Sequence, residues 1–256
     1  MSKRPVVLVV MDGVGVRASD FGNAVNNAYK PTLDNLWENC PHTEIKAHGV
    51  AVGLPSDSDM GNSEVGHNAL GCGQIYSQGA KLVNESIESG DMFTTETWKA
   101  LVDKCKDNGK MHFLGLLSDG NVHSHINHLK ALISRAKEDG VKEVRLHVLL
   151  DGRDVPETSA LIYVDEIENY MAGLNDDSFH ACIASGGGRM KITMDRYEAN
   201  WAMVEEGWHT HVLGEGRQFA SAKEAIETYR AETGVVDQDL PAFVIAKDGK
   251  PLGTIE

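Results

Sequence analysis

A serine at the point where a loop turns into a predicted helix is the first residue in this sequence that could do chemistry. The segment Gly61–His67 reads Gly-Asn-Ser-Glu-Val-Gly-His, follows the polar residues 54–60 and leads into a short apolar-periodic stretch that ends at Gly71. Asn62 or Ser63 can cap such a helix by accepting a hydrogen bond from a free backbone N–H. The free amides and the positive end of the helix dipole also favour an anion beside Ser63. This stretch alone is typical of a capping serine and of a serine that accepts a phosphate.

A carboxylate follows the first apolar run of the chain. Val6–Met11 is a continuous, mostly β-branched stretch, which predicts a buried parallel strand, and Asp12 comes directly after it. Open α/β sheets bind ligands at the carboxyl ends of their strands, so Asp12 is a candidate site residue. An aspartate before a glycine is equally typical of a turn, and both interpretations stay open.

Three later strands show the same pattern of a buried run followed at once by polar residues. The runs 111–117, 144–150 and 179–184 predict strands. The residues that follow them are Asp119, His123 and His125 after the first, Asp151, Arg153 and Asp154 after the second, and Arg189 and Arg196 after the third, beyond a triple glycine. Since parallel strands end at one edge of a sheet, we expect these side chains to meet there. Arginines in such a place hold carboxylate or phosphate oxygens through paired N–H groups.

The elements that must position these residues alternate between strands and helices. Besides the runs above, apolar stretches predict strands at 43–52 and 242–245, and periodic apolar positions predict helices at 31–38, 82–89, 96–105, 123–139, 156–171, 195–206 and 220–230. Alternation of this kind predicts an α/β fold with a parallel sheet between helices and right-handed crossovers. The glycine-rich residues 71–79 are a candidate hinge. The triple glycine alone is typical of a flexible turn, since it matches no phosphate-binding fingerprint.

Composition limits the classes of function. The 256 residues suffice for one large domain or two smaller ones, and the formal charge of −14 argues against a nucleic-acid or membrane-surface binder. Four scattered cysteines without a C-x-x-C pair favour free thiols in a reducing compartment. The N-terminal apolar run is too short to span a membrane. We therefore expect a soluble, cytoplasmic protein.

A cluster of histidines offers a different chemistry. His123, His125 and His128 have the H-x-H-x-x-H spacing of the dinuclear zinc motif in metallo-β-lactamase-like hydrolases. Those enzymes usually carry an aspartate where this chain has Asn127, and they begin with β-rich segments rather than with alternating strands and helices. Histidines three apart on a helix lie on neighbouring faces and can simply be packed or exposed.

Taken together, the motifs resemble those of the cofactor-independent (2,3-bisphosphoglycerate-independent) phosphoglycerate mutases, a family of the alkaline phosphatase superfamily. The matching stretches, in the order of the family, are Val9–Gly13, Met60–His67, Ser118–His125, Leu150–Pro156 and Met194–Arg196. The run Met-Gly-Asn-Ser-Glu-Val-Gly-His is highly specific. The spacing around Arg189 resembles one branch of the family, so Arg189 is assigned less securely than Arg153.

The resemblance implies a role for each matched residue. Ser63 would be the nucleophile that becomes phosphoserine, and Asp12 and Ser63 would ligate a divalent metal, Mn²⁺ above Mg²⁺ or Co²⁺, with two ions in the complete enzyme. The residues that would hold 2- or 3-phosphoglycerate are His123, Arg153, Asp154, Arg189 and Arg196. Asp154 would also move protons to and from the glycerate hydroxyls. The resemblance further implies a monomer.

The resemblance also implies that part of the enzyme lies outside these residues. Family members are about twice as long, and their other metal ligands come from the C-terminal half. Residues 1–78 would be the first part of the phosphatase domain, followed by a transferase domain at 79–256, in a parallel-sheet sandwich that is incomplete. We expect a truncated chain with little or no activity alone, because two ligands do not complete a divalent site, and an exposed apolar edge at Val6–Met11. The alternatives are a non-catalytic phosphoglycerate-binding fragment and another phosphatase or phosphomutase of the superfamily.

Overall fold

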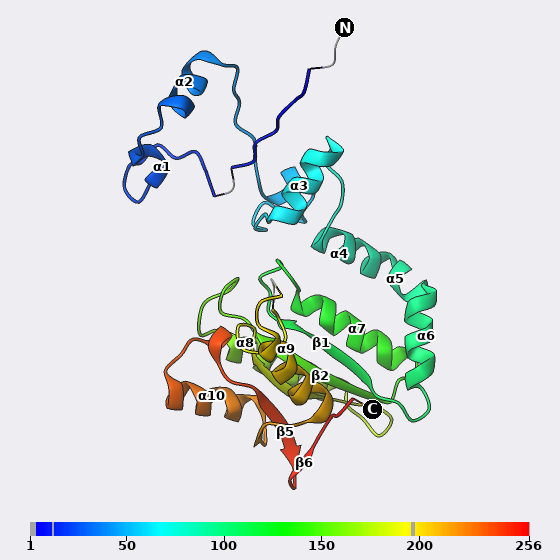
Figure 1. The fold of residues 1–256 in the computed structure, drawn as a ribbon. Coiled ribbons are helices and arrows are strands. Elements are labelled where there is room, and N and C mark those ends of the chain that lie inside the picture. The colour runs from blue at the N-terminus through cyan, green and yellow to red at the C-terminus, as the bar shows by residue number, and fades with distance from the viewer. Residues whose placement is uncertain (1–3, 12, 196–197, 256) are drawn as a thin grey trace. The chain divides into compact units, whose positions relative to one another are not determined.

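The computed structural model describes residues 4–11, 13–195 and 198–255 (Figure 1). It divides into two compact units, Met1–Ile45 and Lys46–Glu256. No helix in the described part of the chain is long and apolar enough to cross a membrane. The helical elements are α1 Ala24–Asn27, α2 Pro31–Asn39, η1 Gly49–Val52, α3 Ser63–Cys72, α4 Ala80–Ser89, α5 Asp91–Thr94, α6 Glu96–Cys105, α7 Ile126–Glu138, α8 Ala160–Leu174, α9 Trp201–Trp208, η2 His209–Leu213, α10 Ala222–Thr233 and η3 Asp237–Asp239. The strands are β1 Met111–Leu117, β2 Glu143–Leu150, β3 His180–Gly188, β4 Arg217–Phe219, β5 Phe243–Lys247 and β6 Lys250–Pro251.

The first unit lacks the strand predicted at its start. Residues 6–11 form no regular element, and their side chains are exposed, Val6 to 94% and Val9 to 72%. The prediction was wrong because an apolar run becomes a strand only when neighbouring strands satisfy its backbone groups, and the described residues provide no partner for this one. The side chains of this apolar run are exposed, as expected. The helix predicted at 31–38 is confirmed as α2, which has a proline in its first turn.

The strand predicted at 43–52 is also wrong, because its second half folds into a tight turn. Residues 49–52 form the short helix η1, which ends at Gly53 with φ +85°. A Cβ on Gly53 would lie 1.9 Å from the carbonyl oxygen of Tyr76. The turn buries Val52 beside Leu54 and Val65 in a small apolar cluster. This cluster supports α3, the helix that begins at the candidate serine.

One buried side chain ties the predicted hinge to that cluster. The Gln78 amide donates to the carbonyl oxygens of Val52 and Val65 at 2.7 and 2.9 Å. The residue after it, Gly79, has φ +54° and ψ −132°, a conformation suited to glycine, and α4 follows. The hinge at residues 71–79 stays a prediction, and in the structure its Gln78 side chain is fixed by two hydrogen bonds.

The second unit is built on a mostly parallel sheet, as expected. The strand order is β1-β2-β3-β5-β4, with β6 beside β5. The neighbours β1, β2 and β3 are parallel, and β4 is parallel to β5, whereas β5 runs antiparallel to β3. The main core packs α6, α7, α8 and α10 against the strands, and a smaller cluster around Ile192 and Leu149 lies apart from it. The mixed α/β prediction is therefore confirmed, with β5 as the antiparallel exception.

Several predicted helices begin later than expected because the preceding residues are used as caps and turns. The helix predicted from His123 begins at Ile126, where His125 Nδ1 accepts a hydrogen bond from the Asn127 amide. The helix predicted from Pro156 begins at Ala160, whose amide donates to the buried carboxylate of Asp237 at 2.8 Å. The helix predicted at 195–206 is α9, which begins at Trp201.

The triple glycine belongs to a strand rather than to a flexible turn. Gly186, Gly187 and Gly188 pair with Val148, Leu149 and Leu150 in β2. A Cβ on Gly186 would lie 2.5 Å from the Phe243 ring, and one on Gly188 would lie 2.3 Å from a backbone oxygen of residue 238. Glycine is needed here because neighbouring groups approach the backbone closely. As a result, β3 keeps its pairing with β2 up to the residue before Arg189.

A chain of polar side chains crosses the interior of the same sheet. His112 on β1 bonds to His147 on β2, with 2.9 Å between the ring nitrogens, and His147 bonds to Ser185 Oγ on β3 at 2.7 Å. Ser185 Oγ lies 2.8 Å from His211 Nδ1, and His211 Nε2 lies 3.1 Å from Thr193 Oγ1. His147, Ser185 and His211 are almost completely buried. Burial is the main cause that lowers the pKa of His147 to about 3 and that of His211 to about 4.

Because His147 and His211 are buried, we expect the free energy of unfolding to fall in mild acid. Each ring is neutral when folded but binds a proton below its ordinary pKa of 6.5 when unfolded. Stability should therefore be full above pH 6.5 and fall as the pH drops toward the folded values, by up to about 1.4 kcal/mol per pH unit for each ring. Urea unfolding between pH 7 and pH 5 measures this slope. His211→Gln should flatten it and the exposed His48→Gln should not; an unchanged slope in His211→Gln would contradict the prediction.

Candidate functional site

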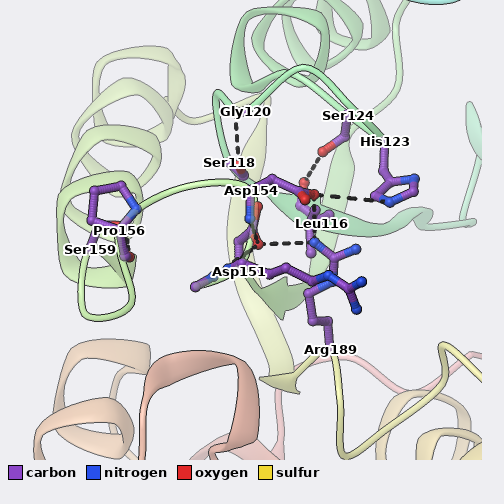
Figure 2. A network of polar contacts seen from close by, with 12 residues as sticks. Leu116, Ser118, Gly120, His123, Ser124, Asp151, Asp154, Pro156, Ser159 and Arg189 are labelled. Carbon is purple, nitrogen blue, oxygen red and sulfur yellow. Dashed lines mark hydrogen bonds and ion pairs between the residues drawn. The ribbon is translucent and has the colours of Figure 1, made fainter. Parts of the chain in front are cut away.

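The register of the sheet brings three strand ends to one level. Leu117 pairs with Leu150 and Leu150 pairs with Gly188, so β1, β2 and β3 end side by side. The residues directly after the three ends are Ser118, Asp151 and Arg189. The expectation that polar residues after these strands share one sheet edge is met, and Figure 2 shows them together.

Asp151 organises the turn after β2. Its Oδ1 accepts hydrogen bonds from the amides of Gly152, Arg153 and Asp154, at 2.9, 3.0 and 3.1 Å. Burial acts to raise the pKa of this carboxyl, but the hydrogen bonds from the Arg153 amide, the Ser118 hydroxyl and the other two amides outweigh burial and lower it. The turn is therefore held around a carboxylate, and it sets the direction in which Arg153 and Asp154 leave the sheet.

Arg189 joins the turn after β2 to the end of β3. Its Nη1 donates to Asp151 Oδ1 at 3.0 Å and to Asp154 Oδ2 at 2.6 Å, and its side chain is 6% exposed. Burial acts to lower the pKa of the guanidinium, but the hydrogen bonds to Asp154 and Asp151 reverse this and raise it. Both hydrogen bonds leave from Nη1. Within the described residues, Nε and Nη2 of Arg189 are therefore the groups that remain to receive an anion.

His123 lies at the rim of the same cluster. Its Nε2 is 4.0 Å from Asp154 Oδ2, and half of its side chain is exposed (Figure 2). Ser124 fixes the loop that carries it, because the Ser124 hydroxyl donates to the Leu116 carbonyl oxygen at 2.5 Å. The Asp154 carboxylate thus lies between a buried guanidinium and an exposed imidazole. Arg189 therefore fixes the position of the Asp154 carboxylate at the end of the sheet.

Arg153 lies outside this network of contacts. Its backbone amide is bonded to Asp151, but its exposed side chain makes no hydrogen bond or ion pair with any residue that the structure describes. An exposed guanidinium beside a buried ion pair is free to bind an anion with two parallel N–H groups. The structure therefore brings His123, Asp154 and Arg189 into contact distance and leaves Arg153 adjacent in sequence to Asp154.

Two contacts of the site could not be found from sequence patterns. The Tyr163 hydroxyl on α8 donates to Asp119 Oδ1 at 2.6 Å, and burial together with this bond raises the pKa of Tyr163 to about 12. The Asn121 amide donates to Asp59 Oδ1 at 2.5 Å, and Asn121 has φ +60°. The second contact links the loop that carries His123 to the segment before Ser63. The sequence offered one indication of the turn, an asparagine between glycine and valine, because asparagine tolerates positive φ.

The structure separates the two roles proposed for the serine segment. Asn62 is the cap of α3, since its Oδ1 accepts a hydrogen bond from the Val65 amide at 3.0 Å. Ser63 is the first helical residue and is exposed. His67 Nδ1 lies 2.7 Å from the Ser63 carbonyl oxygen and 3.2 Å from Ser63 Oγ. A carbonyl can only accept, so Nδ1 carries the proton and cannot also take one from the serine hydroxyl.

The residues at hand do not complete a metal site. Asp12 and Arg196 lie outside the described residues, which leaves Ser63 as the described member of the expected metal pair. Among the residues that the structure describes, no group of three or more His, Cys, Asp or Glu side chains could hold a metal ion. Divalent ions take four to six ligands or more. The described residues therefore do not fit a divalent ion by themselves.

The histidine motif with zinc-like spacing does not converge either. His125 Nδ1 accepts from the Asn127 amide, and His128 Nε2 donates to the side-chain oxygen of Asn84 on α4. His123 faces Asp154. A cavity of about 240 Å³ lies beside these histidines, but Phe113, Leu116 and other apolar side chains line much of it. The cluster around Arg189 therefore offers more charged groups to an anion than this cavity does.

Comparisons with known proteins identify relatives of this chain. The family model described as "BPG-independent PGAM N-terminus" matches residues 83–256. A protein of Leptospira interrogans called "Probable 2,3-bisphosphoglycerate-independent phosphoglycerate mutase" is 56% identical over 99% of this chain and 47% of its own length. One from Trypanosoma brucei brucei, called "2,3-bisphosphoglycerate-independent phosphoglycerate mutase", is 50% identical over all of this chain and 47% of its own length.

A solved structure matches as well. The phosphoglycerate mutase of Leishmania mexicana, solved "at low cobalt concentration", has a TM-score of 0.83 and 50% identity, over 88% of this chain and 42% of that one. The chain thus spans about half the length of the curated relatives it matches. It belongs to the 2,3-bisphosphoglycerate-independent phosphoglycerate mutase family.

Proposed function

We propose that this chain is part of an enzyme that interconverts 3-phosphoglycerate and 2-phosphoglycerate through a phosphoserine at Ser63. The observation that carries the proposal is the cluster of Arg189, Asp154 and His123 at the ends of the strands, with the exposed Arg153 adjacent in sequence to Asp154. The names of the relatives support the same reaction class. Residues 1–78 would belong to a metal-binding phosphatase domain, and 79–256 to a substrate-binding transferase domain.

In this proposal the arginines bind the substrate while a phosphate moves. Arg153, Arg189 and Arg196 would hold the carboxylate and phosphate of phosphoglycerate through paired N–H groups. The phosphate would pass to Ser63 and leave glycerate, which the arginine contacts keep in place while it presents its other hydroxyl. Asp154, between Arg189 and His123, would take the proton from the hydroxyl that attacks and return it to the one that leaves.

A divalent metal belongs to the proposal for the longer protein. Mn²⁺, or Mg²⁺ or Co²⁺ in its place, would lower the pKa of the Ser63 hydroxyl, and Asp12 and Ser63 would supply two of its ligands. The Leishmania mexicana relative was solved with cobalt present. His67 cannot supply this activation in the observed geometry, because its Nδ1 already donates to a carbonyl oxygen. The protein would act as a monomer in the cytoplasm.

A second candidate is favoured by the incomplete metal site. The 256 residues by themselves would bind phosphoglycerate without turning it over, because no described group of side chains can hold a metal ion. Binding without turnover by these residues is compatible with catalysis by the longer protein. The two are separated by measuring the longer protein and the 256-residue chain side by side.

Phosphorus NMR distinguishes the mutase from its alternatives. With 3-phosphoglycerate and Mn²⁺ but no 2,3-bisphosphoglycerate, a protein expressed from the complete reading frame should give the 2-phosphoglycerate resonance and no free phosphate. The 256-residue chain should give neither product. Release of inorganic phosphate without the 2-isomer would instead identify a phosphatase of the superfamily and contradict the proposal.

A further inference from the structure

The strongest feature that the proposed reaction does not use is the buried chain from His112 to Thr193. It runs through His147, Ser185 and His211, so that three neighbouring strands, the helix η2 and the segment after β3 share one line of hydrogen bonds. The chain begins at a half-buried ring on the edge strand β1. It ends four residues after Arg189.

Neutral side chains can satisfy this whole chain. A neutral imidazole has one N–H and one acceptor nitrogen, and a hydroxyl has one O–H and accepts as well. With each member donating to the next in one direction, His147, Ser185 and His211 each donate once and accept once. Hydrogen bonds that follow one another in this way strengthen one another in a low-dielectric interior. The loss of one member therefore weakens its neighbours as well as its own bond.

The last member of the chain is in a strained conformation. Thr193 has φ +72°, and the Met194 amide donates to the Ile192 carbonyl oxygen at 2.8 Å, which is the pattern of a γ-turn with positive φ. A β-branched residue in this region costs about 1–3 kcal/mol and persists only where its surroundings fix it. Those surroundings are His211 Nε2 at Thr193 Oγ1, and the Met203 carbonyl oxygen, which accepts from the Thr193 amide at 3.0 Å.

The strained turn at Thr193 lies at one end of a short segment, the span from Arg189 to Thr193. The other end of this span is bonded to the sheet. The Arg189 amide donates to the Leu150 carbonyl oxygen at 3.1 Å, which fixes the start of the span on β2. Ile192 is fully buried in the smaller apolar cluster. The span from Arg189 to Thr193 is therefore held at both ends, by backbone pairing at one and by the buried histidine chain at the other.

We propose that the chain of His112, His147, Ser185, His211 and Thr193 is a positioning device that fixes the span behind Arg189. The proposal rests on the proposed function in that Arg189 is taken to bind phosphoglycerate. It makes His211 and Thr193 positioning residues, because neither touches the ion pair of Arg189. A purely structural role would also use a satisfied buried chain, but it would not need a strained threonine at its end.

Three substitutions at Thr193 separate positioning from stability. Thr193→Ser keeps the hydroxyl, Thr193→Val removes it at nearly constant shape, and Thr193→Gly removes both the hydroxyl and the strain. If the chain positions Arg189, calorimetry with 3-phosphoglycerate should show affinity within about twofold of the unsubstituted chain for serine, and a loss of about tenfold or more for valine and glycine. The glycine variant should lose less stability in urea than the valine variant, because both leave His211 without its acceptor but glycine adopts this φ freely.

A second readout does not depend on the ligand. The Nε–Hε resonance of Arg189 should move in the valine and glycine variants and stay in place in the serine variant. Valine and glycine variants with unchanged affinity and an unchanged Arg189 resonance would overturn the positioning role and leave a stabilising role alone. If the unsubstituted chain does not bind 3-phosphoglycerate at all, the proposed function fails, and the Arg189 resonance by itself decides whether the chain positions the span.

Discussion

Replacing Ser63 by alanine should abolish phosphoryl transfer in the protein expressed from its complete reading frame, and α3 should remain folded. The structure predicts both outcomes because Asn62, rather than Ser63, caps the helix. Ser63 is exposed in the first turn, where alanine is well tolerated. Loss of the attacking oxygen removes the covalent route entirely, so the rate of 2-phosphoglycerate formation should fall by at least about 10³-fold.

Asn62→Ala is the matched control for that substitution. It removes the cap and should cost about 1 kcal/mol of stability, but it keeps the serine hydroxyl. Phosphorus NMR gives the rate of each variant, and mass spectrometry of the protein mixed with 3-phosphoglycerate should find phosphate on Ser63 in the unsubstituted protein. A Ser63→Ala variant with a near-normal mutase rate would exclude Ser63 as the nucleophile.

Replacing Arg189 by alanine should destabilise the 256-residue chain strongly. Arg189 is buried between Asp151 and Asp154, whose side chains are 1% and 12% exposed. Removal of one partner from a buried ion pair leaves uncompensated charge, which typically costs 3–5 kcal/mol, and about 3 kcal/mol is expected because Asp151 keeps its three amide hydrogen bonds. Urea unfolding followed by circular dichroism measures this free energy.

Arg153→Ala removes the same charge from the neighbouring position and serves as the control. Its guanidinium is exposed and makes no ion pair with the described residues, so its removal should change the unfolding free energy by less than about 0.5 kcal/mol. Equal stability losses in the two variants, or a loss below about 1 kcal/mol in Arg189→Ala, would show that the buried pair does not hold the strand ends together.

The sequence predicts best where a single physical rule dominates. The strands β1, β2 and β3 were predictable because long apolar runs have few other uses in a folded chain, and they end where polar residues begin. Since parallel strands end at one sheet edge, the meeting of Asp151 with Arg189 followed from the pattern without any view of the side chains. The second carboxylate partner of Arg189, Asp154, was beyond that argument, because its position depends on the path of one turn.

Contacts between distant segments were not predictable. Tyr163 lies in the first turn of α8 and looks like an ordinary core residue, yet its hydroxyl donates to Asp119. His112, His147 and His211 are scattered through the sequence, and only the pairing of the strands places them in one line. Local propensities cannot predict these contacts, because the contacts depend on strand register and on which face of the sheet each residue occupies.

The failures at the N-terminal end have a different cause. Val6–Met11 has the composition of a buried strand, but a strand is a property of its neighbours as much as of its residues. In the structure this segment is exposed, and its side chains have no core to enter. The predicted strand at 43–52 failed because Gly49 and Gly53 adopt positive φ and turn the chain into η1. Such turns outweigh β-branched composition.

Calorimetric titration of the 256-residue chain with 3-phosphoglycerate tests the central claim most directly. We expect one binding site in the unsubstituted chain and a loss of affinity of at least about tenfold in Arg153→Ala, a variant whose fold should be intact. Sulfate resembles only the phosphate of the substrate, and glycerate has only its carboxylate and hydroxyls. Both partial ligands should therefore bind more weakly than 3-phosphoglycerate. Absence of saturable binding in the folded, unsubstituted chain, or equal affinity in Arg153→Ala, would contradict the assignment of the strand-end cluster as a phosphoglycerate site.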